Sequence, residues 1–207
     1  MKHLLVAAIL IASALVARAE LFAFCAITSN DSGGYAQFAG ESQLYMDVTL
    51  LGTGQASLVF TNAGPEDSAV SRINFDFVPE LGLNLEAIND GSGVEFQASP
   101  ASPNNLPGGQ RLNNAFISDL SVAAKNPSPK NGLNPYDSVE LVISYDDSCD
   151  LLDALENENL RIGLHVQSFT GGYSESFVNV VPEPGAISML LVGGFALYWC
   201  KAKSRIW

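Results

Sequence analysis

The chain has 207 residues, which is enough for one domain and its targeting segments. Hydrophobic residues make up 47% and charged residues 15%, so the chain is too apolar to be a disordered protein. Residues 20–180 contain five basic and 21 acidic side chains, a net charge of −16, which excludes nucleic acid as a partner. Such acidity favours solubility by mutual repulsion, and diffuse binding of divalent cations is the alternative.

The first segment has the features of a secretory signal peptide. Lys2 precedes an apolar run over residues 4–17, and Ala17-Arg18-Ala19 forms a small-x-small cleavage site. The run is short for a permanent membrane anchor, which needs about 20 apolar residues. We therefore expect a signal peptidase to recognise Ala17 and Ala19 and to remove residues 1–19.

Cysteine usage agrees with export. Cys25 and Cys149 lie in the expected extracytoplasmic part of the chain, where an oxidising compartment would allow them to pair. The sequence does not show whether the two residues are close together, so a disulfide and two free thiols both stay open.

Alternating apolar and polar residues predict strands along most of the chain. The clearest runs cover residues 45–50, 56–61, 72–77, 94–98, 139–145 and 160–167, and weaker ones cover 21–27, 116–122 and 176–181. A period of two buries one face of a strand and wets the other, which is typical of antiparallel sheets. Because a second sheet would cover the apolar face, we predict an all-β antiparallel β-sandwich over residues 20–180, either immunoglobulin-like or jelly-roll-like.

Turn residues separate these runs. Gly52-Thr53-Gly54 predicts a hairpin, and the longest loops cover residues 99–114 and 126–135. A helix is predicted only over residues 150–158, with Ser148 or Asp147 as its N-cap.

Few side chains suit catalysis. His165 is the one histidine that remains after removal of the signal peptide, and the alternation of its strand predicts that it lies on the solvated outer face. The sequence contains no nucleophile elbow, phosphate-binding glycine loop or histidine-rich metal motif. We therefore expect a protein without catalytic activity, cofactor or metal centre. A glycosidase would need two carboxylates that face each other in a cleft.

Acidic residues are densest just before and within the predicted helix, at Asp146, Asp147, Asp150, Asp153 and Glu156. Their spacing differs from that of a calcium-binding loop, which needs alternating oxygen ligands and a glycine at a sharp turn. Acidic side chains at a helix start are favoured by the helix dipole, and we prefer this interpretation to calcium binding.

Exposed aromatic rings would be needed to bind sugars. Both tryptophans, Trp199 and Trp207, lie in the C-terminal tail, but Tyr35, Tyr136 and Tyr173 lie in glycine- or proline-flanked segments. These tyrosines could contact a glycan or could serve the fold alone. A lectin-like module that binds extracellular polysaccharide is therefore an alternative function.

The last segment mirrors the first. Residues 185–200 carry no charge, and Lys201, Lys203 and Arg205 follow them. A helix of this length spans about 24 Å, slightly less than a hydrocarbon core of roughly 30 Å. The basic residues should stay in the cytoplasm as a stop signal, so we expect one transmembrane helix in the inner membrane, with residues 20–180 exported.

A proline-bounded tripeptide, Pro182-Glu183-Pro184, precedes this helix and predicts an extended, accessible tether. Together with the apolar helix and basic tail, it resembles a PEP-CTERM sorting domain over residues 181–207. The resemblance implies a diderm bacterial envelope and an exosortase as the processing partner. This enzyme would remove the helix and leave the protein at the cell surface or in the extracellular matrix. A permanently anchored single-pass membrane protein is the alternative.

Overall fold

The computed structural model describes residues 19–52, 54–99 and 105–180. Within them, ten antiparallel strands form one sheet in the order β5-β8-β3-β2-β1-β10-β9-β4-β7-β6. The strands are β1 (Ala19–Ala26), β2 (Leu44–Gly52), β3 (Gln55–Asn62), β4 (Ala69–Phe77), β5 (Asn84–Asp90), β6 (Phe96–Ser99), β7 (Leu120–Ala124), β8 (Ser138–Ser144), β9 (Leu160–Phe169) and β10 (Tyr173–Val180).

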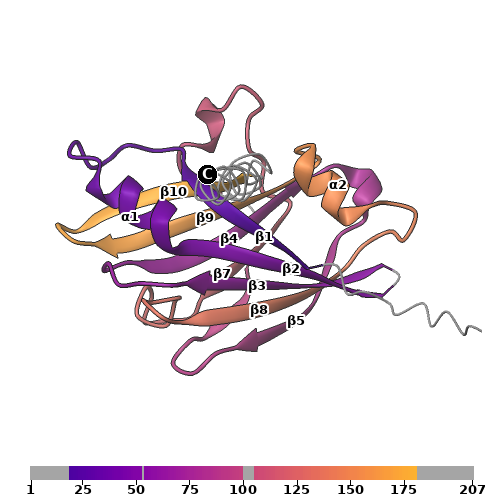
Figure 1. The fold of residues 1–207 in the computed structure, drawn as a ribbon, viewed down its shortest axis with the longest axis horizontal. Helices are drawn as coiled ribbons and strands as arrows, with labels where there is room; N and C mark the ends of the chain where they lie inside the picture. Colours follow the sequence, from indigo (N-terminus) through magenta and orange to yellow (C-terminus); the bar gives the residue numbers. More distant parts are fainter. Residues whose placement is uncertain (1–18, 53, 100–104, 181–207) are drawn as a thin grey trace, which may run out of the picture.

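The sheet curls into a nearly closed, barrel-like shape (Figure 1). Its two end strands, β5 and β6, contact each other. The backbone N–H of Phe96 in β6 donates to Asp90 Oδ1 at the end of β5, at 2.9 Å. The predicted all-β antiparallel class is confirmed. The predicted division into two packed sheets is not confirmed, because curling lets one sheet cover its own apolar face.

The alternation that predicted the strands also defines the inside of this sheet. In β2, Met46 and Val48 are buried, whereas Asp47 between them is exposed. The largest fully buried side chains of this interior include Phe22, Phe24, Phe60, Phe75, Phe169 and Phe177. Burying one such side chain stabilises the fold by about 1.5–3 kcal/mol, so the interior is the main source of stability.

Two α-helices, α1 (Tyr35–Gln43) and α2 (Leu151–Glu156), pack against this core, and Figure 1 shows them toward opposite ends of the sheet. Two short 3₁₀ helices, η1 (Pro79–Leu81) and η2 (Gly109–Arg111), lie in connecting loops. Helix α1 was not predicted. It approaches β10 so closely that a Cβ at Gly40 would lie 2.1 Å from Phe177 Cζ, which only glycine avoids.

Helix α2 was predicted, but its N-cap is different from the two residues expected. Asp150 caps it, because its Oδ1 accepts from the backbone N–H groups of Leu152 at 3.0 Å and Asp153 at 3.2 Å. Ser148 instead donates its hydroxyl to Asp146 Oδ1 at 2.6 Å, in the turn before the helix.

A covering segment, residues 105–118, lies on the outer face of β9 and β10. Its Leu106 and Phe116 are buried and pack with Val178 as a second apolar cluster. Gly163 of β9 makes the close contact possible, since a Cβ there would lie 2.5 Å from Leu106 Cδ2. Phe116, which was expected to begin a weak strand, therefore belongs to this segment, and β7 begins at Leu120. Hollows lie on both sides of the covering segment.

Candidate functional site

A row of paired residues crosses the outer face of the sheet beside the covering segment. Gln97 pairs with Ala123, Ala123 with Arg72, and Arg72 with His165. Directly opposed residues in antiparallel strands project from the same face of a sheet. The small Ala123 side chain stands between Gln97 and Arg72, and a hollow of about 470 Å³ opens here.

We call this space the polar hollow, because amides and hydroxyls dominate its lining. Its polar uncharged residues are Ser71, Gln97, Ser99, Asn105, Asn126, Ser128 and Gln167. Arg72 and His165 are the titratable residues among the described residues that line it, and no carboxylate is among them. The hollow is thus locally cationic in a domain that is strongly acidic.

Arg72 is half-buried, and burial lowers the pKa of its guanidinium. Within the described parts of the chain, this guanidinium forms no hydrogen bond and no ion pair. Its position results from a β-bulge, because Val70 faces Val166 while Arg72 faces His165, leaving Ser71 as the extra residue. The Ser71 hydroxyl secures the bulge by donating to the carbonyl of His165 at 3.1 Å.

His165 was predicted to be a solvated surface residue, and this prediction is wrong in degree. The side chain does project from the outer face, but loop residues wall the hollow and leave it half-buried, with Nδ1 buried and without a hydrogen-bond partner. Desolvation by burial, and secondly the charge of Arg72, lower the pKa of His165. The imidazole is therefore neutral at pH 7.

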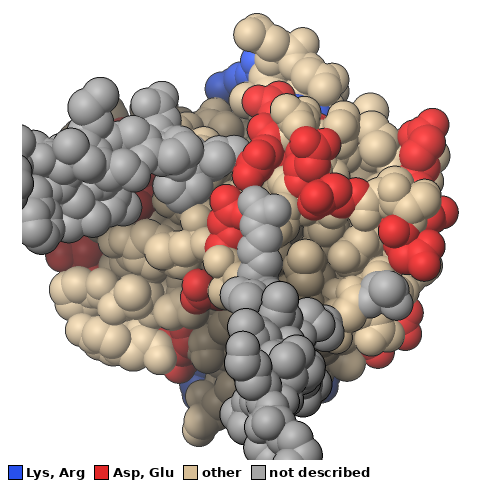
Figure 2. All heavy atoms as spheres, turned by 45° about the vertical axis from the view of Figure 1, so that its right-hand side comes forward, with Lys and Arg blue, Asp and Glu red and all other residues tan. Residues whose placement is uncertain are grey.

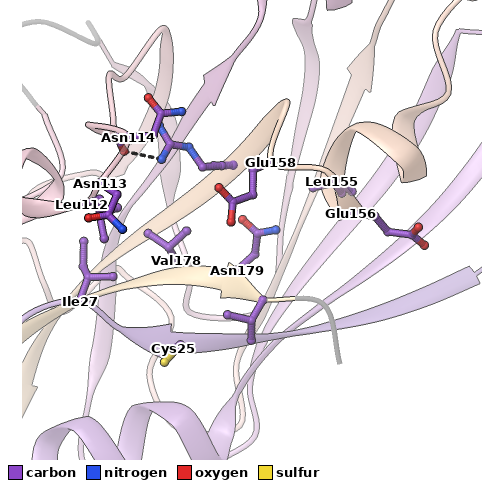
Figure 3. Close-up of a pocket in the computed structure, with 12 residues that line it drawn as sticks. Cys25, Ile27, Leu112, Asn113, Asn114, Leu155, Glu156, Glu158, Val178 and Asn179 are labelled. Atoms are coloured by element: carbon purple, nitrogen blue, oxygen red, sulfur yellow. Dashed lines mark hydrogen bonds between the residues drawn. The ribbon is translucent and has the colours of Figure 1, made fainter. Parts of the chain in front are cut away.

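A second hollow of about 420 Å³ lies on the other side of the covering segment, beside the end of β10 (Figure 3). Ile27, Leu112 and Val178 form part of its apolar lining, so we call it the apolar hollow. Arg161 also lines it, but its charge and several of its donors have partners within the protein. It pairs with Asp76, donates to the carbonyls of Asn114 at 2.7 Å and Ala115 at 2.9 Å, and lies over the Phe116 ring.

Two carboxylates, Glu156 and Glu158, line the apolar hollow. Figure 3 shows Glu158 pointing toward Asn179 and Glu156 pointing away from it. Asn179 is itself committed, since its Oδ1 accepts from the backbone N–H of Ile162 at 2.7 Å. The facing pair of carboxylates that a glycosidase needs is therefore not formed by these two residues.

The two cysteines of the domain are free thiols, so the disulfide considered above is not formed. Cys25 Sγ donates to Glu41 Oε1 at 3.4 Å, whereas Cys149 Sγ donates to the carbonyl of Glu80 at 3.6 Å. Burial, together with the neighbouring Glu41 carboxylate, raises the pKa of the Cys25 thiol. The thiols thus belong to separate local environments.

Most residues of the predicted targeting signals lie outside the described residues. These are Ala17, Pro182, Glu183, Pro184, Lys201, Lys203 and Arg205, as well as the predicted helix over residues 185–200. Ala19 is described and begins β1, where it pairs with Thr49. In the portion of the chain that the structure covers, no helix has the length and apolar character needed to cross a membrane.

The acidic residues around α2 have structural partners. Asp150 caps the helix, and Asp146 accepts hydrogen bonds from Ser148 that lower its pKa. Over residues 19–52, 54–99 and 105–180, no cluster of three or more histidine, cysteine or carboxylate side chains could hold a metal ion. Figure 2, which brings the α2 side forward, shows several separate acidic groups there and few basic side chains.

The three tyrosines named as possible sugar contacts touch loops that lie close to one another. The Tyr35 hydroxyl donates to Glu66 and also interacts with Thr170, and Glu66 raises the pKa of the phenol. Tyr136, with 74% of its surface exposed, lies against Gly64, two residues before Glu66. Tyr173 lies against Gly171, the residue after Thr170. These contacts bring the tyrosines to one region of the surface.

Comparisons of this chain with protein-family models, with curated proteins and with solved structures find no match. The functional interpretation therefore depends on the residues themselves. Sequence reasoning missed the polar hollow, because pairing of Arg72 with His165 depends on the register of two strands about 90 residues apart. The available signal was an arginine at an outer-face position in an otherwise acidic domain.

Proposed function

We propose that this chain is a non-catalytic exported protein that an exosortase sorts to the cell surface or extracellular matrix. The proposal rests on the Pro182-Glu183-Pro184 tether, the uncharged residues 185–200 and the basic tail. The exported domain is the acidic, nearly closed sheet, and the inner membrane holds the chain only during sorting. In this view the protein is the substrate of the processing enzyme.

One structural observation is compatible with this proposal. The first strand, β1, and the last strand, β10, are antiparallel neighbours, with Ala23 facing Val180. The start of β1 at Ala19 and the end of β10 at Val180 therefore lie at the same end of this strand pair, about 13 Å apart along β1. Both ends of the described domain thus lie on its same side, which suits two consecutive attachments to one membrane.

The test is mass spectrometry of the mature protein from its native host, with and without the exosortase. We expect the wild-type protein to begin at Glu20 and to end within residues 182–185, and the protein from the exosortase-deficient strain to retain its C-terminus through Trp207. Replacing Glu183→Ala in the recognition tripeptide should have the same effect as loss of the enzyme. Glu158→Ala is a matched control, because it removes a carboxylate from the folded domain and should leave processing intact. Retention of the C-terminal helix in both strains would refute sorting and favour a permanent anchor.

The connected tyrosines favour a second candidate function, binding of extracellular polysaccharide. Exposed aromatic rings offer apolar faces to sugars, and the contacts of Tyr35, Tyr136 and Tyr173 place all three in one region. Glycan binding by the full chain should then decrease when Tyr136→Ala or Tyr173→Ala is introduced. Tyr45→Phe is the control, because its hydroxyl bonds to the carbonyl of Ser42 within the fold. Unchanged binding in both alanine variants would exclude this surface.

A further inference from the structure

We propose that the polar hollow binds a small, singly charged, hydroxyl-rich carboxylate of the sugar-acid class, with Arg72 holding the carboxylate. This site is independent of the sorting signal and of the tyrosine surface. Three features define the proposal: an unpaired cation and unpaired amides around it, which attract the ligand, and the acidity of the surrounding domain, which limits the charge of the ligand.

The cation is the first feature. A half-buried guanidinium normally pairs with a carboxylate, as Arg161 does with Asp76 on the same two strands. Arg72 instead faces the neutral imidazole of His165, and no carboxylate lines the hollow among the described residues. An arginine presents a planar fork of N–H donors that matches a carboxylate with two parallel hydrogen bonds. The hollow thus holds a preformed place for one anionic group.

The lining is the second feature. The side-chain amides of Gln97, Asn105 and Asn126 form no hydrogen bonds with described residues. Gln167 Nε2 lies 3.2 Å from His165 Nε2, so its carbonyl oxygen stays available as an acceptor. Amides both donate and accept, which is what a ligand with several hydroxyl groups requires. The volume of about 470 Å³ lies within the usual range of small-molecule sites.

The field of the whole domain is the third feature. Residues 20–180 carry a net charge of −16, which repels anions and repels multiply charged ones most strongly. One guanidinium can offset this repulsion for a single carboxylate at short range but not for a chain of phosphates. A monocarboxylate is therefore preferred over ligands that carry two or more negative charges, such as the phosphate dianion.

The chain offers a direct reporter for the test, because it contains only two histidines, His3 and His165. In the full-length His3→Gln chain, purified in detergent with labelled histidine, the His165 ring resonances report on the hollow. We expect glucuronate to shift them in a saturable manner at millimolar concentrations. Glucose, which lacks the carboxylate, should bind at least about tenfold more weakly, because it leaves the charged hydrogen bonds unmade. Acetate, which lacks the hydroxyls, should also bind more weakly than glucuronate.

Variants distinguish a loss of ligand binding from a loss of folding. Arg72→Gln should weaken glucuronate binding by about tenfold to a hundredfold, and Arg72→Lys, which keeps the charge, by less. Arg111→Gln is the matched control, since Arg111 is exposed and lies outside the hollow. If Arg72→Gln does not fold, Gln97→Ala tests the same wall and should weaken binding several-fold.

Four results would overturn the proposal. Absence of a glucuronate shift removes the site, and equal binding of glucose removes the need for an anion. Tighter binding of phosphate assigns the hollow to a different ligand class. Undiminished binding in Arg72→Gln places the ligand elsewhere. Because none of these measurements depends on C-terminal processing, sorting and ligand binding can fail separately.

Discussion

The outer face of β4 and β9 carries two arginines in opposite situations. Arg161 faces Asp76 across the two strands and lies beneath the covering segment, with its side chain 8% exposed. Arg72 lies four positions from Asp76 along β4, faces His165, and opens onto the polar hollow. The same residue type on the same face thus becomes a structural connector in one place and an unpaired cation in the other.

The difference shows that cross-strand pairing determines the role of each arginine. A carboxylate opposite Arg161 neutralises its charge, and the carbonyls of Asn114 and Ala115 accept two further hydrogen bonds from it. Arg72 has a neutral partner and a bulge beside it, so its donors stay available. Experiments that remove each arginine should therefore affect different properties of the protein.

The largest expected effect is on the stability of the region where the covering segment lies over Arg161. Arg161→Ala should lower the free energy of unfolding by about 3 kcal/mol, because it leaves Asp76 unpaired and removes two hydrogen bonds to the covering segment. Urea denaturation of the full chain measures this. Arg72→Ala is the matched control and should cost less than about 1 kcal/mol. Equal losses in the two variants would contradict the division of roles.

A smaller loss is expected from Gly163→Ala, which tests how closely the covering segment lies on β9. The new Cβ would be 2.5 Å from Leu106 Cδ2 and 3.0 Å from Phe116 Cζ, so the segment must shift outward. We expect a decrease of about 1–3 kcal/mol in unfolding free energy, as for other overpacked sites. Hydrogen exchange over residues 105–118 should accelerate in this variant, and unchanged exchange would mean that the contact is not close.

The strands that line the polar hollow should tolerate a larger side chain. Ala123→Leu places a larger side chain on the row between Gln97 and Arg72, where the hollow has room for it. We expect the unfolding free energy to change by less than about 1 kcal/mol, while glucuronate no longer shifts the His165 resonances. A loss of unfolding free energy as large as that of Gly163→Ala would show that the side chains around the hollow are packed as tightly as those beneath the covering segment.

Much of the fold could be predicted from the sequence, because a strand with one buried face repeats every two residues. β5 escaped prediction since a bulge around Glu86 breaks its alternation and no residue of the strand is fully buried. Helix α1 escaped because its buried contact face consists largely of Ala36, Ala39 and Gly40, which leave no amphipathic pattern. Curling of the sheet depends on the pairing order of all ten strands, and the alternation within one strand does not encode that order.

The site was harder to predict than the fold. The alternation indicated correctly that His165 projects from an outer face, but it did not single out Arg72. Their pairing requires the register of β4 against β9, and the bulge at Ser71 sets that register. The burial of His165 requires loop residues that have no periodic pattern at all. Local patterns thus identify the face on which a side chain lies, and only long-range contacts identify its neighbours.

The smallest expected effect concerns the titration of His165, and it separates burial from charge. Burial is the larger cause of its lowered pKa and Arg72 the smaller, so NMR titration should show a pKa below the usual value of about 6.5. Arg72→Gln should raise this pKa only part of the way back, whereas Arg161→Gln should leave it unchanged. Because the folded state binds this proton less readily than the unfolded state, the stability contributed by neutral His165 is fully present above the unfolded pKa. It is lost as the pH falls through the folded pKa.

Full recovery of the usual pKa in Arg72→Gln would show that the charge of Arg72 dominates and that the imidazole is well solvated. The hollow would then be a shallow depression. Arg72 and Arg161 would differ only in whether each is paired with a carboxylate.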